Sequence, residues 1–582
     1  MIGLVWATNS GNCAAQRLAA AWPGECTLYS GSVRDQLTQA WAQSRTIVAF
    51  LATGATVRLI APLLEGKRTD PGVVCVDEMG RYAIALLGGH SGDANETAER
   101  VAQVLGAQAI LTTGSDSAGI AGLDTLGFTV GNPKRLAEVS RAMLDGEPIG
   151  FSADAVWPLP ALPGNVGDFP AARHRLLITD RLTTDSAHSD ALILHPPSLV
   201  LGIGASRGVA ESEIATLVET VLSTAGLAAG SVRGVATIDV KAAEPGLVAF
   251  ARQRNWPITT YPAGALARVT VPNPSETVRQ AVGTPSVAEA AALLAASGAP
   301  AMPAPGVAEA TALLTGGTLV VPKQVSPMAT VAVARLQPRG RLAIVGIGPG
   351  AADLRAPRAT EELRRASIVI GLDRYVSQIR ALLRPGTRII ESGLGAEERR
   401  ARSAVDLAKA GNAVALIGSG DAGIYAMASP TLELADTSID VVVVPGITAG
   451  LAASALLGAP LGHDHGYISL SDMHTPWEVI ERRLDRLAEA DMVVCLYNPR
   501  SSQRTRQLTE ALDILGKHRP AATPVGVVRD ATRAGQRVTI TTLAELEPSE
   551  VDMNTVVIVG SSVTRVVSGR LVTPRGYRWM AG

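Results

Sequence analysis

The residues best suited to hold a ligand are glycine-rich turns that follow short hydrophobic runs. Residues 345–351 read VGIGPGA after the run 342–345, residues 418–425 read GSGDAGIY after 414–417, and residues 445–449 read PGITA after four valines. In α/β sheets, ligands bind at the carboxyl ends of the strands. These turns therefore predict one shared pocket. A fourth run, 492–496, ends in Tyr497-Asn-Pro-Arg500 and adds an aromatic wall.

The first turn is compatible with a dinucleotide site when it is read alone. Gly346, Gly348 and Ala351 satisfy GxGxxG/A after a strand, and Asp373 follows the next hydrophobic run. Pro349 argues against this interpretation, because a pyrophosphate needs backbone N–H groups and proline has none. A nicotinamide-dependent oxidoreductase remains an alternative only if this turn is the whole nucleotide site.

Taken together, the turns resemble the tetrapyrrole methylase family, which uses S-adenosylmethionine to methylate carbon atoms of corrinoid and sirohaem precursors. The resemblance rests on VGIGPG, GSGDAGIYAMASP, VVPGITAGLAASALLGAPLGHD and YNPRS, and covers about residues 340–582. It is closest to the branch that methylates C-17 of precorrin-3B or cobalt-factor III. Ala422 follows the GD turn where sister enzymes often have proline, which fits this branch. The resemblance implies a two-lobed class III methyltransferase fold and a homodimer.

The resemblance also implies the cofactor site. The floor would consist of Gly346, Gly348 and Pro349, and the residues that cradle adenosylmethionine would be Gly420, Asp421, Ala422, Ile424 and Tyr425. Thr448 and Ala449 would bond its methionine end. Tyr497 and Asn498 would flank its nucleoside. A carboxylate such as Asp421 suits a cationic sulfonium or amino group.

Methyl transfer from a sulfonium needs alignment and exclusion of water more than acid–base help. We therefore predict that no side chain is indispensable as a base. The implied substrate is a macrocycle with several carboxylates, and arginines can pair with carboxylates through two parallel hydrogen bonds. The candidate anchors are Arg374, Arg399, Arg500, Arg504 and Arg533.

Three histidines lie close together in the sequence, His463, His465 and His474, next to Asp464 and Asp472. We do not predict a metal site, because alternate residues of a loop need not converge. In the C-17 branch methylation accompanies ring contraction, so a group that protonates near C-20 would be useful. The histidines are candidates for that role.

Two parts of the first 335 residues resemble the cobalamin G family, the cobalt-precorrin-5A hydrolases, which open a lactone and release acetaldehyde; the middle region between them matches poorly. Residues 1–126 carry GATVRLIAPLL, DPGVVCVDE and LLGGHSGDAN, whereas residues 197–335 carry GIGASRG, TIDVKAAEPGL, SVAEAAALL and VPKQVSP. Lactone hydrolysis needs a base and an oxyanion site, and we assign the base to His90 with Glu78 or Glu96. The alternative is a non-catalytic corrinoid-binding module.

The elements that must position these residues follow an α/β pattern. We predict strands at 46–51, 72–76, 82–87, 198–205, 235–239 and 267–271, helices at 94–105 and 211–225, and related helices at 286–294 and 306–314. Residues 127–196 have weak periodicity and predict an irregular middle region. A polar stretch at 335–341 predicts the main boundary. The predicted domains are therefore 1–126, 127–196, 197–335 and 336–582, the last with lobes at about 340–445 and 446–582.

Composition narrows the possible partners. Lys plus Arg (52) nearly equals Asp plus Glu (53), so we predict no nucleic-acid partner. The four scattered cysteines do not form a disulfide framework or a zinc motif, which favours the reducing cytoplasm. Residues 441–462 are uncharged, but Pro445 and Gly446 interrupt them, so we predict a short buried strand, a loop and a helix, and no membrane span.

Overall fold

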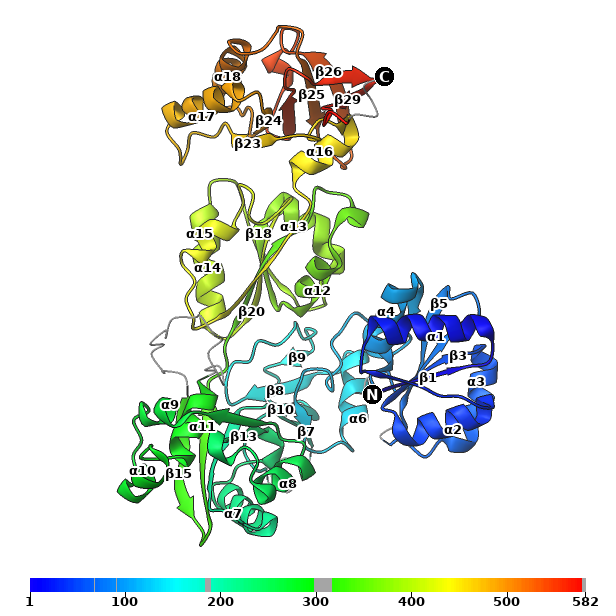
Figure 1. The fold of residues 1–582 in the computed structure, drawn as a ribbon, viewed down its shortest axis with the longest axis vertical. Helices are drawn as coiled ribbons and strands as arrows, with labels where there is room; N and C mark the ends of the chain where they lie inside the picture. Colours follow the sequence, from blue (N-terminus) through cyan, green and yellow to red (C-terminus); the bar gives the residue numbers. More distant parts are fainter. Residues whose placement is uncertain (67–68, 90–91, 184–189, 298–316, 578–582) are drawn as a thin grey trace. The chain divides into compact units, whose positions relative to one another are not determined.

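The computed structural model describes residues 1–66, 69–89, 92–183, 190–297 and 317–577 of the 582-residue chain (Figure 1). His90 and the helix predicted at 306–314 lie outside the described residues. The chain forms two compact α/β units. One comprises Met1–Val156, Leu162–Pro338 and Arg384–Gly386, and the other Trp157–Ala161, Arg339–Leu383 and Thr387–Gly582. The units therefore divide within the polar stretch 335–341.

The N-terminal sheet has the order β2-β1-β3-β4-β5-β6, and β4 and β5 form its antiparallel pair. Its strands are β1 (Ile2–Trp6), β2 (Cys26–Leu28), β3 (Thr46–Phe50), β4 (Gly72–Val76), β5 (Tyr82–Leu87) and β6 (Gln108–Ile110). Helices α1 (Asn9–Ala21) and α4 (Ala94–Leu105) pack on one face, and α2 (Val33–Gln43) and α3 (Thr53–Ile60) on the other. The apolar runs at β3 and β4 are buried on both faces, as parallel strands between helices must be.

The sequence predicted an irregular middle region, and this prediction is wrong. It forms a sheet of its own in the order β7-β11-β10-β8-β9, with α6 (Leu136–Leu144) against it. The strands are β7 (Thr129–Val130), β8 (Ile149–Ala153), β9 (Val166–Gly167), β10 (His174–Ile178) and β11 (Ala191–His195). Short strands separated by proline-rich connections give little periodicity, which is why the pattern was missed.

The third sheet has the order β14-β13-β12-β16-β15. Its strands are β12 (Leu199–Ala205), β13 (Val232–Ile238), β14 (Ile258–Tyr261), β15 (Gly317–Val325) and β16 (Ala329–Leu336). Helices α7 (Glu211–Thr224) and α8 (Pro245–Gln253) cover one face and α11 (Ala288–Ala296) the other. The strand predicted at 267–271 is wrong: α9 (Ala263–Ala267) occupies its start, and Val269 and Val271 pack on the α11 core from a loop.

The second unit begins with a fully parallel sheet in the order β19-β18-β20-β17-β21, which we call the N-lobe. Its strands are β17 (Arg341–Gly346), β18 (Ile368–Leu372), β19 (Arg388–Ser392), β20 (Ala413–Gly418) and β21 (Asp440–Val444). Helices α12 (Pro357–Arg365) and α13 (Asp373–Ile379) cover one face, and α14 (Glu397–Lys409) and α15 (Ala428–Leu432) the other (Figure 1). β21 is an edge strand and Val443 is 42% exposed, so the prediction that it is buried is wrong.

The C-lobe follows from α16 (Ala449–Leu457). Its main sheet has the order β23-β24-β27-β25-β26 and contains β23 (His465–Ser469), β24 (Val493–Tyr497), β25 (Pro524–Arg529), β26 (Arg537–Thr542) and β27 (Thr555–Val559). Helices α17 (Trp477–Glu489) and α18 (Gln507–Gly516) pack on one face and α16 on the other. A small sheet adds β22 (Gly458–Ala459), β28 (Arg565–Val567) and β29 (Arg570–Val572).

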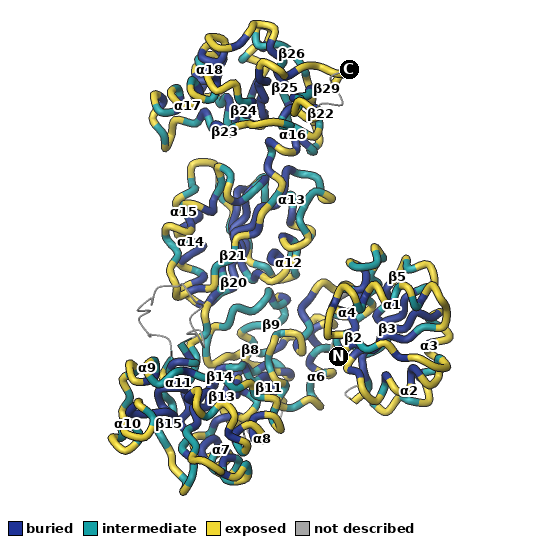
Figure 2. The backbone as a smooth tube through the Cα atoms, viewed as in Figure 1, coloured by how far each residue is buried: buried dark blue, intermediate teal, exposed yellow. Residues whose placement is uncertain are grey.

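Burial follows these layers: the sheet strands form the dark centre of each lobe, and the outer helix faces are exposed (Figure 2). Residues 441–462 form β21, a loop, α16 and β22. Among the described helices, none combines the length and hydropathy that crossing a bilayer requires.

Candidate active site

Three predicted turns meet at one edge of the N-lobe sheet. They follow β20, β17 and β21, which are adjacent and parallel, with Gly346 paired with Gly418 and Val345 paired with Val444. The strands therefore end level with one another, and their loops emerge side by side. The three turns therefore lie together at one sheet edge, and the shared pocket stays a prediction.

The loops are packed backbone against backbone. The N–H of Gly420 donates to the carbonyl oxygen of Gly348 over 2.8 Å, and the N–H of Gly348 donates to that of Gly420 over 3.1 Å. A β-carbon on Gly346 would lie 2.7 Å from the Gly420 oxygen, and one on Gly446 would overlap the same atom. Glycine is required here because the chains approach too closely for any side chain.

Asp421 ties two of these loops together. Its Oδ1 accepts the N–H of Gly423 over 2.8 Å and its Oδ2 accepts the N–H of Gly446 over 3.0 Å. The predicted role of this carboxylate was contact with a cation. The structure adds that both carboxylate oxygens already hold backbone, so any ligand contact would be an additional one. Ala422 follows with its side chain buried in the N-lobe core, and Ile424 is half-buried.

Tyr497 connects the end of β24 to the start of α16. Its hydroxyl oxygen accepts the N–H of Gly450 over 2.6 Å and lies 2.6 Å from the Oγ1 of Thr448, the residue that precedes α16. The first turn of α16, at Ala449, is thereby held beside the aromatic ring. Burial raises the pKa of the Tyr497 hydroxyl above its ordinary value, because the ionised form would be poorly solvated there.

Two further tyrosines surround Tyr497. The ring centres of Tyr425 and Tyr467 lie 5.4 and 5.6 Å from that of Tyr497. Tyr425 has a φ of 50° and donates its hydroxyl to the carbonyl of Tyr467 over 2.8 Å, which joins the N-lobe loop to β23. Asn498 has a φ of 49°. Such left-handed non-glycine residues concentrate at functional loops, and these two lie at predicted cofactor positions.

The loop after β25 completes the contacts between the lobes, and the sequence predicted only one of its residues. Thr532 accepts the N–H of Ala351 through its Oγ1 over 3.2 Å. Arg533 donates to the carbonyl of Pro349 over 2.7 Å and to the Oγ of Ser419 over 2.6 Å. Its side chain also lies where a β-carbon of Gly350 would be. Arg533 thus holds two N-lobe loops together, whereas the sequence predicted that it would anchor the substrate.

Arg504 is also used internally. It is 8% exposed and donates from Nε and Nη2 to the carbonyl of Asn498 over 3.2 and 2.9 Å. Burial lowers the pKa of its guanidinium. Arg504 supports the Asn498 loop and is not presented to a ligand. This differs from the role of substrate anchor that the sequence predicted for it. Arg399 is exposed on α14, which covers a face of the N-lobe sheet and not its binding edge.

Arg374 and Arg500 line an open polar pocket of about 470 Å³. Arg374 follows β18 in the first turn of α13, and Arg500 follows β24. Of the predicted anchors, these two are the ones that the structure brings together.

The three histidines do not converge. β23 and β24 are parallel, and His465 pairs with Val493 at their amino ends whereas Ser469 pairs with Tyr497 at their carboxyl ends. At about 3.3 Å per residue, His465 lies about 13 Å along the strand from the Tyr497 edge. His463 lies two residues before it, toward the same amino end of the strand. His474 is exposed in the loop beyond the carboxyl end, so only it lies on the predicted side.

The acids predicted for lactone hydrolysis lie at opposite ends of the β4–β5 hairpin. Glu78 follows β4 and accepts the Oγ1–H of Thr8 over 2.8 Å. Glu96 is exposed in the first turn of α4, whose entry at Gly92 packs on Gly72, where β4 begins. The strand between them spans about 20 Å. They cannot serve one site together.

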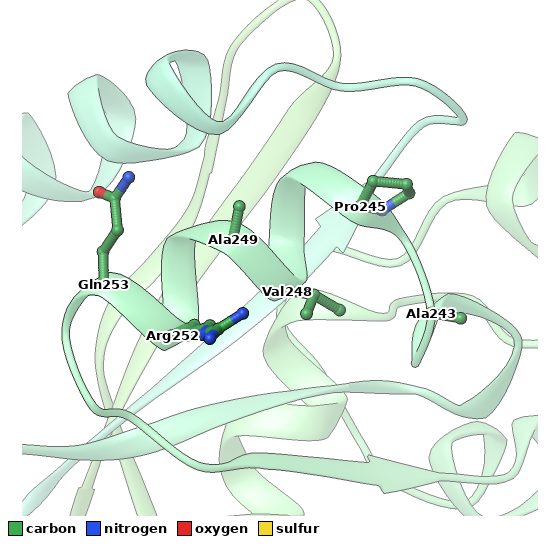
Figure 3. Close-up of a pocket in the computed structure, with 6 residues that line it drawn as sticks. All are labelled: Ala243, Pro245, Val248, Ala249, Arg252 and Gln253. Carbon is green, nitrogen blue, oxygen red and sulfur yellow. The ribbon is translucent and has the colours of Figure 1, made fainter.

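A second hollow, of about 760 Å³, runs along α8 in the first unit (Figure 3). Its lining comes from α8 and from Ala243, two residues before that helix, and Arg252 is its charged member. It contains no pair of groups able to perform acid–base or nucleophilic chemistry, so we assign it no role.

Three family models match separate parts of the chain. Residues 341–547 match the model of the Tetrapyrrole (Corrin/Porphyrin) Methylases. Residues 35–116 match that of the Cobalamin synthesis G N-terminal region, and residues 199–303 that of the Cobalamin synthesis G C-terminus.

Three curated relatives each match about two fifths of the chain. A probable cobalt-factor III C(17)-methyltransferase of Salmonella typhimurium is 46% identical over 239 residues, 40% of this chain and 99% of that protein. A precorrin-3B C(17)-methyltransferase of Sinorhizobium sp is 41% identical over 249 residues, 41% of this chain and 97% of that protein. A cobalt-factor III methyltransferase of Priestia megaterium is 43% identical over 247 residues, 41% of this chain but 46% of that protein.

Proposed function

Since the chain belongs to the tetrapyrrole (corrin/porphyrin) methylase family, we propose that residues 336–582 transfer a methyl group from S-adenosylmethionine to C-17 of a precorrin in cobalamin biosynthesis. The observation that carries this proposal is the meeting of the β17, β20 and β21 loops beside Tyr497 and α16. A dinucleotide site would use the loop after β17 alone. Here that loop is hydrogen-bonded to the loop after β20.

The residues at this edge fit adenosylmethionine. The glycines let the loops pack backbone against backbone at the sheet edge, and the start of α16 at Ala449 favours a carboxylate through the helix dipole. Thr448 is held there by Tyr497. We propose that Thr448 and Ala449 hold the methionine end, that the residues Gly420–Tyr425 line the cofactor, and that Tyr497 and Asn498 flank its nucleoside.

When bound, adenosylmethionine supplies an electrophilic methyl group whose leaving group is a neutral thioether. The protein must then fix the cofactor and the acceptor carbon in line and exclude water. The backbone contacts of Gly348, Gly420 and Gly446, together with Asp421, make the loops rigid in advance. We propose that this preorganisation, and no single general base, provides the rate enhancement.

The acceptor is proposed to be precorrin-3B, with conversion to precorrin-4 and ring contraction. Cobalt-factor III is the alternative acceptor, because relatives of similar identity carry both names. The test is to incubate the full chain with adenosylmethionine and each macrocycle, and to measure adenosylhomocysteine and product mass. Methylation of one macrocycle selects the route, and methylation of neither contradicts the proposal.

For the N-terminal region we propose hydrolysis of the cobalt-precorrin-5A lactone, based on the two cobalamin G matches. Because Glu78 and Glu96 lie apart, at most one of them acts with His90. We expect one of the variants Glu78→Gln and Glu96→Gln to lose acetaldehyde release by the full chain. The variant that retains acetaldehyde release then serves as the control. No acetaldehyde from the wild-type protein would favour a corrinoid-binding module instead.

The family resemblance also leads us to propose a homodimer. Sedimentation equilibrium of the full chain should give twice the chain mass of 60.1 kDa, and a monomer at every concentration tested would contradict this.

A further inference from the structure

The pocket that contains Arg374 and Arg500 is built by both lobes. Arg374 is its N-lobe wall, whereas the C-lobe contributes the segment after β24 and the segment before β27. The other lining residues are Ser501, Ser502, Thr505, Val551, Asp552, Met553 and Asn554. All three segments leave or enter strands near the edge that holds the Tyr497 loop. The volume of about 470 Å³ is near the lower end of ligand pockets, which suits part of a large ligand.

The two guanidinium groups in this pocket lack acidic partners. Among the described residues, neither Arg374 nor Arg500 has a carboxylate within 4.0 Å. Arg374 donates to the Oδ1 of Asn554 over 3.2 Å, and its Nε is buried without a hydrogen-bond partner among the described residues. Arg500 donates to the carbonyl of Ser549 over 3.3 Å. Both retain unused donors.

The one acid of the lining does not neutralise them. Asp552 is paired with Arg529 over 3.0 Å, and it also accepts the N–H of Asn554 over 2.9 Å and the Oγ1–H of Thr555 over 2.8 Å. Two cations therefore face one acid that already has a cation of its own. A concave site of this charge favours an anion.

We propose that this pocket binds a carboxylate arm of the tetrapyrrole substrate between Arg374 and Arg500. This rests on the proposed methyltransferase function and deepens it. Planar guanidinium groups match a carboxylate with paired hydrogen bonds. An arm held here would contact both lobes and would fix one edge of the ring relative to the cofactor loops.

The methionine carboxylate of the cofactor could pair with the same arginines. The experiment therefore distinguishes binding of that carboxylate from binding of a carboxylate arm of the macrocycle. The variants are Arg374→Gln and Arg500→Gln, and the control is Arg506→Gln, an exposed arginine nearby that pairs with Glu510. We would measure KM for the macrocycle that the wild type methylates, kcat, and the Kd of adenosylhomocysteine by calorimetry. We expect the macrocycle KM to rise roughly tenfold or more in each variant, with the Kd of adenosylhomocysteine and the control unchanged.

An unchanged macrocycle KM, or a rise in the Kd of adenosylhomocysteine alone, would overturn the proposal. A second measurement uses macrocycle esterified at its carboxylates. Esterification should weaken binding to the wild type, and by a smaller factor in the Gln variants, because the interaction is already lost. Equal losses in all proteins would also overturn it. If the wild type methylates no macrocycle, it is the proposed function that fails, and retained adenosylhomocysteine binding would show that the protein is folded.

Discussion

At the scale of single residues, the site depends on side chains that hold backbone. Asp421 bonds two loop N–H groups, the Tyr497 hydroxyl accepts a third N–H at the start of α16, and Arg533 donates to a loop carbonyl. Each contact joins segments that a cofactor would touch. Their loss should therefore weaken cofactor binding more than it alters the chemical step.

Asp421→Asn replaces one acceptor oxygen by an NH₂ group that cannot accept the N–H of Gly423 or Gly446. Hydrogen bonds to charged groups contribute about 1.5–3 kcal/mol, so the Kd of adenosylhomocysteine should rise roughly tenfold or more. Calorimetry measures it. Asp436→Asn is the matched control, because Asp436 also accepts a backbone N–H in the N-lobe but pairs with exposed Lys409. Equal effects in both variants would contradict a local role for Asp421.

Tyr497→Phe leaves the N–H of Gly450 without its acceptor and should lower both stability and affinity for adenosylhomocysteine. A lost buried hydrogen bond costs about 1–3 kcal/mol, measured by denaturant unfolding. Tyr467→Phe is the control, since it keeps the neighbouring ring and its hydroxyl has no hydrogen bond among the described residues.

The raised pKa of Tyr497 also sets a pH dependence. Its contribution to stability is fully present below the unfolded tyrosine pKa of about 10 and is lost as the pH rises above it. The stability difference between wild type and Tyr497→Phe should therefore shrink above about pH 10. A difference that grows there would mean that the fold favours the ionised hydroxyl.

At the scale of elements, adjacent parallel strands bring the loops together. The apolar runs of β17 and β20 are buried, so their direction and register are well specified. The run at 267–271 alternates apolar and polar residues, unlike the continuous apolar runs of β17 and β20, and it stays a loop because its valines pack on the α11 core without a strand partner. Alternation thus predicts burial more reliably than it predicts pairing.

Gly446→Ala tests the loop packing. Its β-carbon would overlap the carbonyl oxygen of Gly420, and Gly446 is not among the glycines with positive φ, so the effect is steric. We expect a loss of about 1–3 kcal/mol in unfolding free energy and weak adenosylhomocysteine binding. Gly393→Ala is the control, because nothing lies within 4 Å of its β-carbon position. Full binding by Gly446→Ala would show that the loops separate easily.

At the scale of the whole molecule, two compact units suggest two unfolding transitions. Adenosylhomocysteine at 100 times its Kd should stabilise the methylase unit by about 2.7 kcal/mol and leave the other transition unchanged. Differential scanning calorimetry of the full chain measures both, with NAD as the control ligand. A shift with NAD in place of adenosylhomocysteine would support the oxidoreductase alternative.

The sequence by itself determined the α/β class, most of the buried strands and the family, because these depend on local runs and on turns where glycine is sterically required. It could not determine which charged side chains share a site. Arg533 and Pro349 lie 184 positions apart, and no local pattern encodes their contact. Only the tertiary structure separated His465 from Tyr497 and Glu78 from Glu96, since the end of a strand that a residue occupies matters only once strand directions are known. It also left Arg374 and Arg500 facing one pocket and turned Arg504 and Arg533 toward backbone carbonyls, because partner choice depends on packing between the lobes.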